Sequence, residues 1–152
     1  MSCRTLHVAR SFRPETGGVA VAVHHLAVEL RERGHEVTLA SLDAADQGRE
    51  GITVLGRTSR GYGYAPGYVP WLRAQAGGFD AVVVHGLWQY PGFGAWRALR
   101  RRPTPYLVYC HGMLDPWFKR AHPLKHLKKW LYWPWAEYRV LRDAAAVCFT
   151  CE

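Results

Sequence analysis

The amino-acid sequence predicts an α/β fold in which helices cover both faces of a doubly wound parallel sheet. Two features of the sequence point to this fold class. Short apolar runs of strand length alternate with segments whose apolar residues recur at helical spacing. The chain also has 152 residues, which is the usual size of one domain. We therefore expect a single domain over residues 1–152, incomplete at its C-terminal end because no helix follows the last strand, with about six parallel strands in the order 3-2-1-4-5-6.

The first third of the chain contains the clearest helical pattern. An apolar run over residues 5–9 predicts the first strand, and a loop follows it. Apolar residues then recur at helical spacing, namely Val19, Val23, Leu26 and Leu30. Gly34 is placed to end this helix. Alternating residues predict a second strand over residues 36–42, and a short apolar run predicts a third over residues 52–55.

The middle of the chain begins with a long loop. Residues 56–67 are rich in glycine and tyrosine and have no period. Loops of this length inside a compact domain are usually functional or mobile. A short helix over residues 68–76 and a strand over residues 79–84 should follow.

The last third repeats the alternation of helix and strand. Residues 90–100 predict a helix, and residues 106–110 predict the fifth strand. A long helical region is expected over residues 119–142, which Pro134 should kink or divide because proline lacks the backbone N–H. Residues 145–149 predict one more strand.

The composition excludes several classes of protein. With 49% hydrophobic and 21% charged residues, the chain is neither disordered nor collagen-like. No apolar run approaches the roughly 18 to 20 residues that cross a bilayer, and the N-terminus lacks the pattern of a signal peptide. We therefore expect a cytoplasmic protein. The net charge of +8 favours anionic partners, such as nucleic acid, anionic lipid or a phosphorylated small molecule.

The cysteines predict neither a disulfide framework nor a metal site. The chain has four, at Cys3, Cys110, Cys148 and Cys151, which is too few for a disulfide-built fold of this size. Cys148 and Cys151 form a C-x-x-C pair, but no second pair stands at the spacing of a zinc ribbon. Reduced thiols are therefore expected.

Functional residues are expected directly after strands, because ligands of open parallel sheets bind beyond the carboxyl ends of the strands. Three segments stand there: residues 13–18, 85–88 and 111–117. Gly17 and Gly18 precede the first helix, where a ligand can approach free backbone N–H groups at the positive end of the helix dipole. A phosphate suits that position, and a simple tight turn is the other interpretation. The dinucleotide fingerprint G-x-G-x-x-G is absent, which weighs against a dehydrogenase.

The other two segments share one theme, a His-Gly pair followed by an aromatic residue. His85 is followed by Trp88, and His111 is followed by Trp117. Two such turns on adjacent strands bring two imidazoles to one rim, where they can bond a sugar hydroxyl or a phosphate, and tryptophan offers a flat face for a sugar ring. Asp115 suits either a base or, more commonly, a helix cap.

The segment from residue 97 to residue 142 is strongly basic and aromatic. It holds eleven Lys or Arg residues against Asp115 and Glu137. The centre of this segment resembles an interfacial helix that lies on an anionic membrane. The membrane-facing set would be Lys125, Lys128, Lys129, Trp130 and Trp133. A core helix with a solvated basic face explains the same pattern equally well.

Four motifs, spread over nearly the whole chain, together resemble glycosyltransferase family 4. They are residues 12–18 (FRPETGG), 30–37 (LRERGHEV), 85–88 (HGLW) and 111–117 (HGMLDPW). Members of this family have the GT-B fold, in which two Rossmann-like domains face each other across a cleft. The resemblance implies that this chain is the N-terminal, acceptor-side domain.

The resemblance also implies roles for single residues. Gly17 and Gly18 are expected to approach the diphosphate of the donor. His111 is expected to be catalytic and to lie near the transferred sugar. The acceptor-side rim is expected to comprise His85, Trp88, Asp115 and Trp117. No protein nucleophile is assigned.

The implied reaction is a retaining transfer of a hexose from a nucleotide sugar to a lipid-linked or polysaccharide acceptor. The nucleotide sugar is a co-substrate, and no cofactor or metal is expected. The donor half of the family, with its E-x7-E motif, has no counterpart in these residues, so we expect the chain to be inactive alone and to need a C-terminal domain as partner. The protein is expected to be peripheral at the inner face of the membrane.

A second function remains open, that of a basic membrane-surface or nucleic-acid-binding module on a Rossmann-like scaffold. Both functions explain the charge. The glycine pair and the two His-Gly turns together favour the glycosyltransferase, so nucleic acid is the less expected partner.

Overall fold

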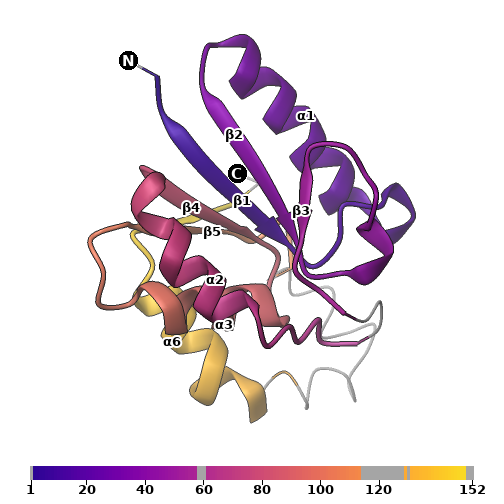
Figure 1. Cartoon of the computed structure of the whole chain (residues 1–152). Helices are drawn as coiled ribbons and strands as arrows, with labels where there is room; N and C mark the ends of the chain where they lie inside the picture. Colours follow the sequence, from indigo (N-terminus) through magenta and orange to yellow (C-terminus); the bar gives the residue numbers. More distant parts are fainter. Residues whose placement is uncertain (1, 58–60, 114–128, 130, 150–152) are drawn as a thin grey trace.

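The structure is a computed structural model, and it describes residues 2–57, 61–113, 129 and 131–149 (Figure 1). In this part of the chain six strands form one parallel sheet in the order β3-β2-β1-β4-β5-β6. This order confirms the predicted topology. The strands are β1 (Arg4–Ala9), β2 (Glu36–Ser41), β3 (Ile52–Val54), β4 (Ala81–His85), β5 (Tyr106–Tyr109) and β6 (Ala146–Cys148).

Helices lie on both faces of the sheet, as predicted. The helix α1 (Gly18–Glu32) follows β1 and packs on one face. The helices α2 (Tyr68–Gln75), α3 (Tyr90–Leu99) and α6 (Tyr138–Arg142) gather together away from α1, at the lower left of Figure 1. Three single-turn elements lie in the connections. They are η1 (Pro14–Thr16) between β1 and α1, η2 (Ala44–Asp46) between β2 and β3, and η3 (Ala76–Gly78) between α2 and β4.

A small core lies between α1 and the sheet. Val23 and Ala27 of α1 pack there with Ala9, Val37 and Leu39 of the first two strands. Because successive side chains of a strand point to opposite faces, Leu6 and Val8 of β1 enter the other core, while His7 lies on the α1 side.

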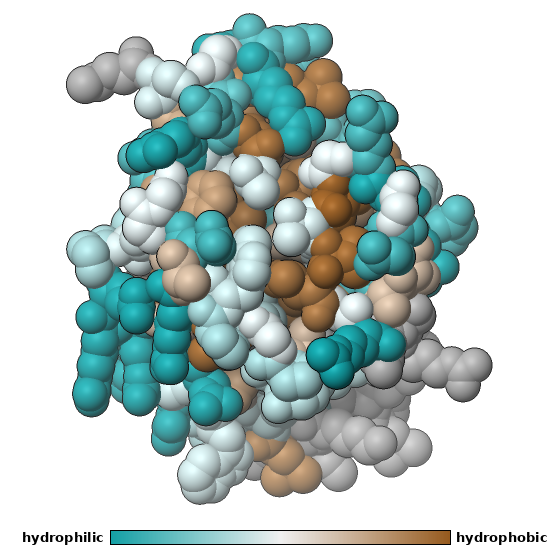
Figure 2. All heavy atoms as spheres, viewed as in Figure 1, coloured by the Kyte–Doolittle hydropathy of each residue, from teal (hydrophilic) through white to brown (hydrophobic). Residues whose placement is uncertain are grey.

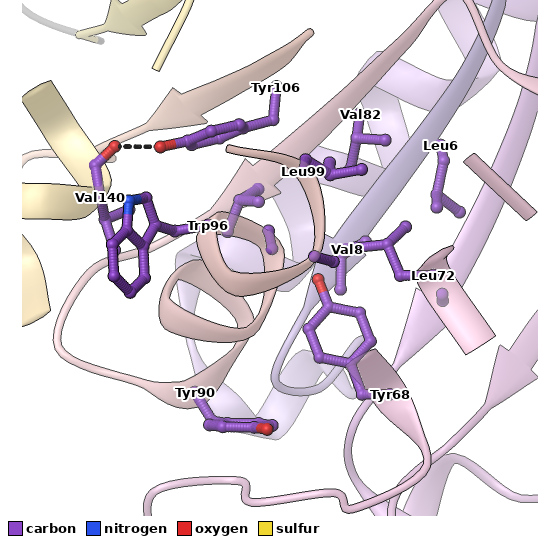
Figure 3. Packing of buried hydrophobic residues seen from close by; sticks show 14 of the residues in the cluster. Leu6, Val8, Tyr68, Leu72, Val82, Tyr90, Trp96, Leu99, Tyr106 and Val140 are labelled. Atoms are coloured by element: carbon purple, nitrogen blue, oxygen red, sulfur yellow. Dashed lines mark hydrogen bonds between the residues drawn. The ribbon is translucent and has the colours of Figure 1, made fainter. Parts of the chain in front are cut away.

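The larger core lies between the sheet and the other helices (Figure 3). Tyr68 and Leu72 of α2, Trp96 and Leu99 of α3, and Val140 of α6 meet the strands there. The hydroxyl of Tyr106 donates a hydrogen bond of 2.6 Å to the Val140 carbonyl, so β5 and α6 are joined inside the core (Figure 3).

The segment 61–67 belongs to the predicted long loop and is attached to the fold through aromatic rings. Tyr62 and Tyr64 make edge contacts with Tyr90, at ring-centroid distances of 5.7 and 4.8 Å. The Tyr62 hydroxyl is hydrogen-bonded to that of Tyr132. These contacts hold the loop beside the start of α3.

Pro134 interrupts the last helical region, as predicted. Residues Trp133–Glu137 form a π-helical turn, η4, before the regular helix α6. A proline lacks the N–H that the regular helical ladder needs, which explains the wider turn at this place. The earlier part of the predicted region, over residues 119–128, lies outside the described residues.

Several large hydrophobic side chains of the described residues are exposed at the surface. Figure 2 shows, for the face seen in Figure 1, hydrophilic side chains along the edges and hydrophobic ones nearer the middle. The most exposed large hydrophobic residues of the described part are Trp135, Leu131, Tyr64, Phe149, Tyr138 and Val21. Leu131, Trp135 and Tyr138 lie close together in the sequence, around η4.

Candidate functional site

The carboxyl ends of the parallel strands meet at one edge of the sheet, and the predicted site residues cluster there. Strand β1 ends at Ala9, β4 ends at His85, and His111 follows the end of β5 by two residues. The start of α1, at Gly18, comes back to the same edge after the loop that follows β1.

The two glycines leave the beginning of α1 uncovered. Gly17 has φ +120°, a left-handed conformation that side chains other than glycine rarely adopt. At both Gly17 and Gly18, an added Cβ would meet no described atom within 4 Å. The helix therefore begins on an open surface. The Gly17 N–H donates to the Pro14 carbonyl and the Ala20 N–H to the Gly17 carbonyl, so the N–H groups of Gly18 and Val19 are those best placed to bond a ligand.

A cleft lies between this helix start and the ends of β1 and β4. It is lined by Ala9, Arg10, Ser11, Thr16, Val19, His85, Gln89 and Met113. Thr16 and Val19 flank the glycine pair directly. The cleft thus joins the first two of the three predicted segments, and Met113 brings in the third.

Three histidines form a continuous hydrogen-bonded row behind this cleft. His7 Nδ1 lies 2.9 Å from His85 Nε2, and His85 Nδ1 lies 2.9 Å from His111 Nε2. His7 and His85 are buried, with 2% and 1% of their surfaces exposed. His111 is half-buried, and its ring stacks on that of Tyr109. The predicted pair of imidazoles is therefore in direct contact.

Burial keeps these imidazoles neutral. It lowers the pKa of His7 to about 4, to which the charge of Arg31 also contributes. Burial holds the pKa of His85 well below its usual range, and the adjacent His7 and His111 add to this. The pKa of His111 is lowered as well, again by burial. Each ring therefore has one N–H donor and one bare nitrogen acceptor at neutral pH.

The two His-Gly turns bend the chain sharply. Gly86 and Gly112 have φ values of +87° and +72°. His111 and Trp88 also have positive φ, at +48° and +65°, which is uncommon for residues other than glycine. Such conformations cluster at functional sites, where the surrounding structure holds them.

A second cleft opens beside Trp88. It is lined by Leu87, Trp88, Gln89, Met113 and Lys129. The Lys129 ammonium lies 5.1 Å from the centre of the Trp88 ring, and the ring of Trp133 lies 5.8 Å from it. Among the described residues, the buried Trp88 Nε1 has no hydrogen-bond partner. This cleft and the first share Gln89 and Met113, so they are neighbours.

Glu137 lies behind Trp88 and was not among the predicted site residues. Its carboxylate accepts a hydrogen bond of 3.2 Å from the Trp88 N–H, and the residue is 2% exposed. Burial raises the pKa of Glu137 to about 7, although the Trp88 bond and the charge of Lys129 oppose the shift. The π-helical turn after Pro134 brings this carboxyl to the site.

Asp43 holds the loop after β1 in place. Its buried carboxylate lies 3.5 Å from both the Arg10 and the Arg13 guanidinium groups. The nearby Asp46 accepts a hydrogen bond of 2.9 Å from the Phe12 N–H. Arg10 in turn lines the first cleft. These acids therefore shape the entrance of the site through the loop.

Several predicted site residues lie outside the described residues. They are Asp115, Trp117, Lys125, Lys128 and Trp130. Cys151 of the C-x-x-C pair also lies outside them, whereas Cys3, Cys110 and Cys148 are free thiols. Sequence reasoning missed His7, Gln89, Met113 and Glu137. For His7 a signal existed, because a histidine in a strand that is otherwise apolar is unusual.

Among the described residues, no group of three or more His, Cys, Asp or Glu side chains is arranged to hold a metal ion. No helix among the described elements has the length and apolar character needed to cross a membrane.

Residues 17–152, most of the chain, match the family described as glycosyl transferase 4-like domain. The chain belongs to this family. It is therefore a glycosyltransferase-like module. The resemblance to glycosyltransferase family 4, which was based on four sequence motifs, is confirmed. Among curated protein sequences, none matches the chain.

One solved structure supports the fold. The domain is similar to an alpha-glucosyltransferase in complex with UDP and a 13-mer DNA containing a HMU base, with a TM-score of 0.60 and 16% identity. The alignment covers 98% of this chain and 38% of that enzyme, so the chain spans less than two fifths of its length. A protein of unknown function from Vibrio parahaemolyticus aligns with a TM-score of only 0.45 and 11% identity, over 99% of this chain and 94% of the other. The Rossmann-like half of a GT-B fold is confirmed by the first of these structures.

Proposed function

We propose that this domain forms one wall of the site in which a retaining glycosyltransferase transfers a hexose from a nucleotide sugar to a lipid-linked or polysaccharide acceptor. The observation that carries the proposal is the first cleft, where the start of α1 and the His85 side chain face the same space. The UDP bound to the similar alpha-glucosyltransferase supports a nucleoside diphosphate as the ligand.

The beginning of α1 is the proposed contact for the donor diphosphate. A helix start concentrates positive potential and free N–H groups, and both favour a phosphate. The 15 residues of α1 form a full helix behind it, and no side chain of Gly17 or Gly18 blocks the approach. The same groups stabilise the negative charge that grows on the diphosphate as it leaves.

His111 is the proposed catalytic residue near the transferred sugar. Its imidazole is neutral, so it can donate a hydrogen bond to a hydroxyl or phosphate oxygen without a full charge. Retention at the anomeric carbon then requires the acceptor and the leaving diphosphate to lie on the same side of the sugar. We assign this reaction no covalent intermediate on the protein.

The second cleft is the proposed acceptor side. Trp88 lines this cleft with an aromatic ring, and the Lys129 ammonium, which lies over that ring, suits an anionic group of the acceptor. Asp115 and Trp117 remain proposed members of this side. As in the GT-B fold, we expect a second Rossmann-like domain to supply the opposite wall and the contacts to the nucleoside.

The first test is a titration of ¹⁵N-labelled protein with UDP, followed by NMR. We expect the largest shifts at the backbone amides of Gly17, Gly18 and Val19. The variant Gly18→Val should weaken the apparent affinity by about tenfold, because its side chain fills the space above the helix start. An added Cβ at Gly18 meets no described atom within 4 Å, so this change leaves the fold undisturbed.

The matched control is Gly77→Val, since an added Cβ at Gly77 is equally unobstructed. This variant should bind UDP as the parent does. Two outcomes would contradict the proposal. One is that the largest shifts fall at Arg73 of α2 and Arg97 of α3, and the other is that the parent and Gly18→Val bind UDP with equal affinity.

A second candidate function, a module that binds anionic membrane surfaces, is favoured by one observation. Leu131 and Trp135, on the turns around η4, have 62% and 71% of their surfaces exposed. Apolar side chains next to basic residues are typical of interfacial segments. The two functions are compatible, because a lipid-linked acceptor lies at a membrane.

A further inference from the structure

A row of four side chains runs from the middle of the sheet to the candidate site. Thr5 Oγ1 lies 3.2 Å from His7 Nε2, and His7 Nδ1 lies 2.9 Å from His85 Nε2. His85 Nδ1 lies 2.9 Å from His111 Nε2. The rings of His7 and His85 are nearly parallel, at 18°. Every ring nitrogen of His7 and His85 is therefore engaged within the row.

Each contact between two ring nitrogens requires one proton between them, since two bare nitrogens repel and two N–H groups clash. A neutral imidazole carries only one proton. His85, engaged at both nitrogens, must therefore donate to one neighbour and accept from the other. The direction of its two hydrogen bonds then fixes the protons of His7 and His111.

Only two neutral arrangements satisfy this rule. In the outward arrangement His7 donates to His85 and His85 donates to His111, so His111 carries its own proton on Nδ1. In the inward arrangement His111 donates to His85 and His85 donates to His7, so Nδ1 of His111 is bare. Thr5 fits both, because a hydroxyl can donate to His7 or accept from it.

We propose that His7 is a positioning residue that, through His85, determines whether His111 presents a proton donor or an acceptor at Nδ1 to a bound ligand. No described residue forms a hydrogen bond with Nδ1 of His111, and the ring is half-buried at the edge of the site. Only the identity of that ligand, a phosphate or a sugar hydroxyl, rests on the function proposed above.

A change from the outward to the inward arrangement conserves protons. His111 gives its Nδ1 proton to the ligand and receives one at Nε2 from His85. His85 receives one at Nε2 from His7, which receives one at Nε2 from Thr5, and the Thr5 hydroxyl regains a proton from solvent. One proton thus enters at Thr5 for each proton that leaves at His111, and all three rings end neutral.

The test is NMR of the whole chain with ¹⁵N-labelled histidine, which reports the protonated nitrogen of each ring. In the parent, we expect the protonated nitrogens of His7, His85 and His111 to correspond to one arrangement, either the outward or the inward one. His7→Phe keeps an aromatic ring but has no nitrogen to bond His85. Residue 7 does not touch His111. Even so, the ratio of the Nδ1-protonated to the Nε2-protonated form of His111 should change by about fivefold, which is the effect of one lost hydrogen bond.

The matched control is His24→Phe, on the exposed side of α1, which should leave the His111 ratio unchanged. If His7→Phe does not fold, Thr5→Val tests the same row from the end opposite His111. Without the hydroxyl, one arrangement leaves a bare nitrogen at His7 Nε2 and the other leaves an unpaired N–H, and since these differ in their cost of burial the ratio should also change. An unchanged ratio in a folded variant, or a His85 ring protonated on both nitrogens, would overturn the proposal. These spectra contain no nucleotide, so a failure of UDP to bind would leave the result standing.

Discussion

At the scale of single residues, the buried carboxyl of Glu137 couples stability to pH. Its pKa is about 7 in the folded chain and near 4.5 in the unfolded chain. Between these values the folded state holds a proton that the unfolded state releases, so this residue lowers the free energy of unfolding as pH rises from about 4.5 to 7. Glu137→Gln should therefore stabilise the protein at pH 8, by up to roughly 3 kcal/mol.

Urea denaturation of parent and variant at pH 5 and pH 8 measures this effect. The difference between them should grow with pH, because glutamine keeps an acceptor for the Trp88 N–H but has no charge to bury. The depressed pKa of His7 acts in the opposite sense, since it raises stability as pH rises from about 4 to 6.5, but it is common to both proteins. The exposed Glu50→Gln is the control. A difference that does not depend on pH would refute this prediction.

The residues of the site were predictable only in part, because some of them meet residues that are far away in the sequence. The strand and His-Gly pattern predicted that His85 and His111 would meet, because adjacent parallel strands end at one edge. The contact between His7 and His85 joins residues 78 positions apart, on strands whose register one sequence does not fix. Glu137 was likewise missed, since its position depends on the π-helical turn after Pro134.

At the scale of elements, the close approach of α2 and α3 depends on Gly94. A Cβ added there would lie 2.6 Å from two ring carbons of Tyr68. That ring has little room to move, because Tyr68 is fully buried and its hydroxyl donates to the Pro91 carbonyl. We expect Gly94→Ala to lower the free energy of unfolding by about 1–2 kcal/mol, as overpacking outweighs the gain in helix propensity.

Thermal and urea unfolding of Gly94→Ala should be compared with Gly77→Ala. The control removes the same backbone freedom at a glycine whose added Cβ meets no described atom within 4 Å, so its effect should stay within about 0.5 kcal/mol. Equal stability of the two variants would show that Tyr68 can yield, and that packing between the helices is looser than described.

Element boundaries were predicted well where a pattern had both a period and an end signal. The helix before Gly34 is an example, since apolar spacing and a terminal glycine both marked it. The fourth strand was predicted over residues 79–84 and is found at Ala81–His85. Pairing with β1 begins at Ala81 and pairing with β5 begins at Val82, so Phe79 and Asp80 lie before the strand.

At the scale of the whole molecule, the basic and aromatic segment over residues 97–142 predicts binding to lipid. The chain should bind vesicles that contain anionic lipid more tightly than neutral vesicles, and salt should weaken the binding by screening. Trp135→Ser should reduce the affinity by about tenfold, because it removes a large exposed aromatic side chain from the segment around η4. Sedimentation with vesicles, at two salt concentrations, measures both effects.

The control is Val21→Ser, an exposed apolar residue on α1. It should bind vesicles as the parent does. Equal partitioning into anionic and neutral vesicles would reject the membrane role, and tight salt-sensitive binding to DNA with none to vesicles would favour the nucleic-acid module instead.

The strand order also determines what happens while the chain is being synthesised. Strand β1 is made first yet ends in the middle of the sheet, between β2 and β4. The backbone edge of β1 that pairs with β4 stays unpaired, and the apolar side chains of Leu6 and Val8 stay uncovered, until the ribosome has produced residues 81–85. An unpaired edge beside apolar side chains is a template for other strands, including those of neighbouring nascent copies. The interval between these two strands is therefore when the growing chain is most vulnerable to aggregation.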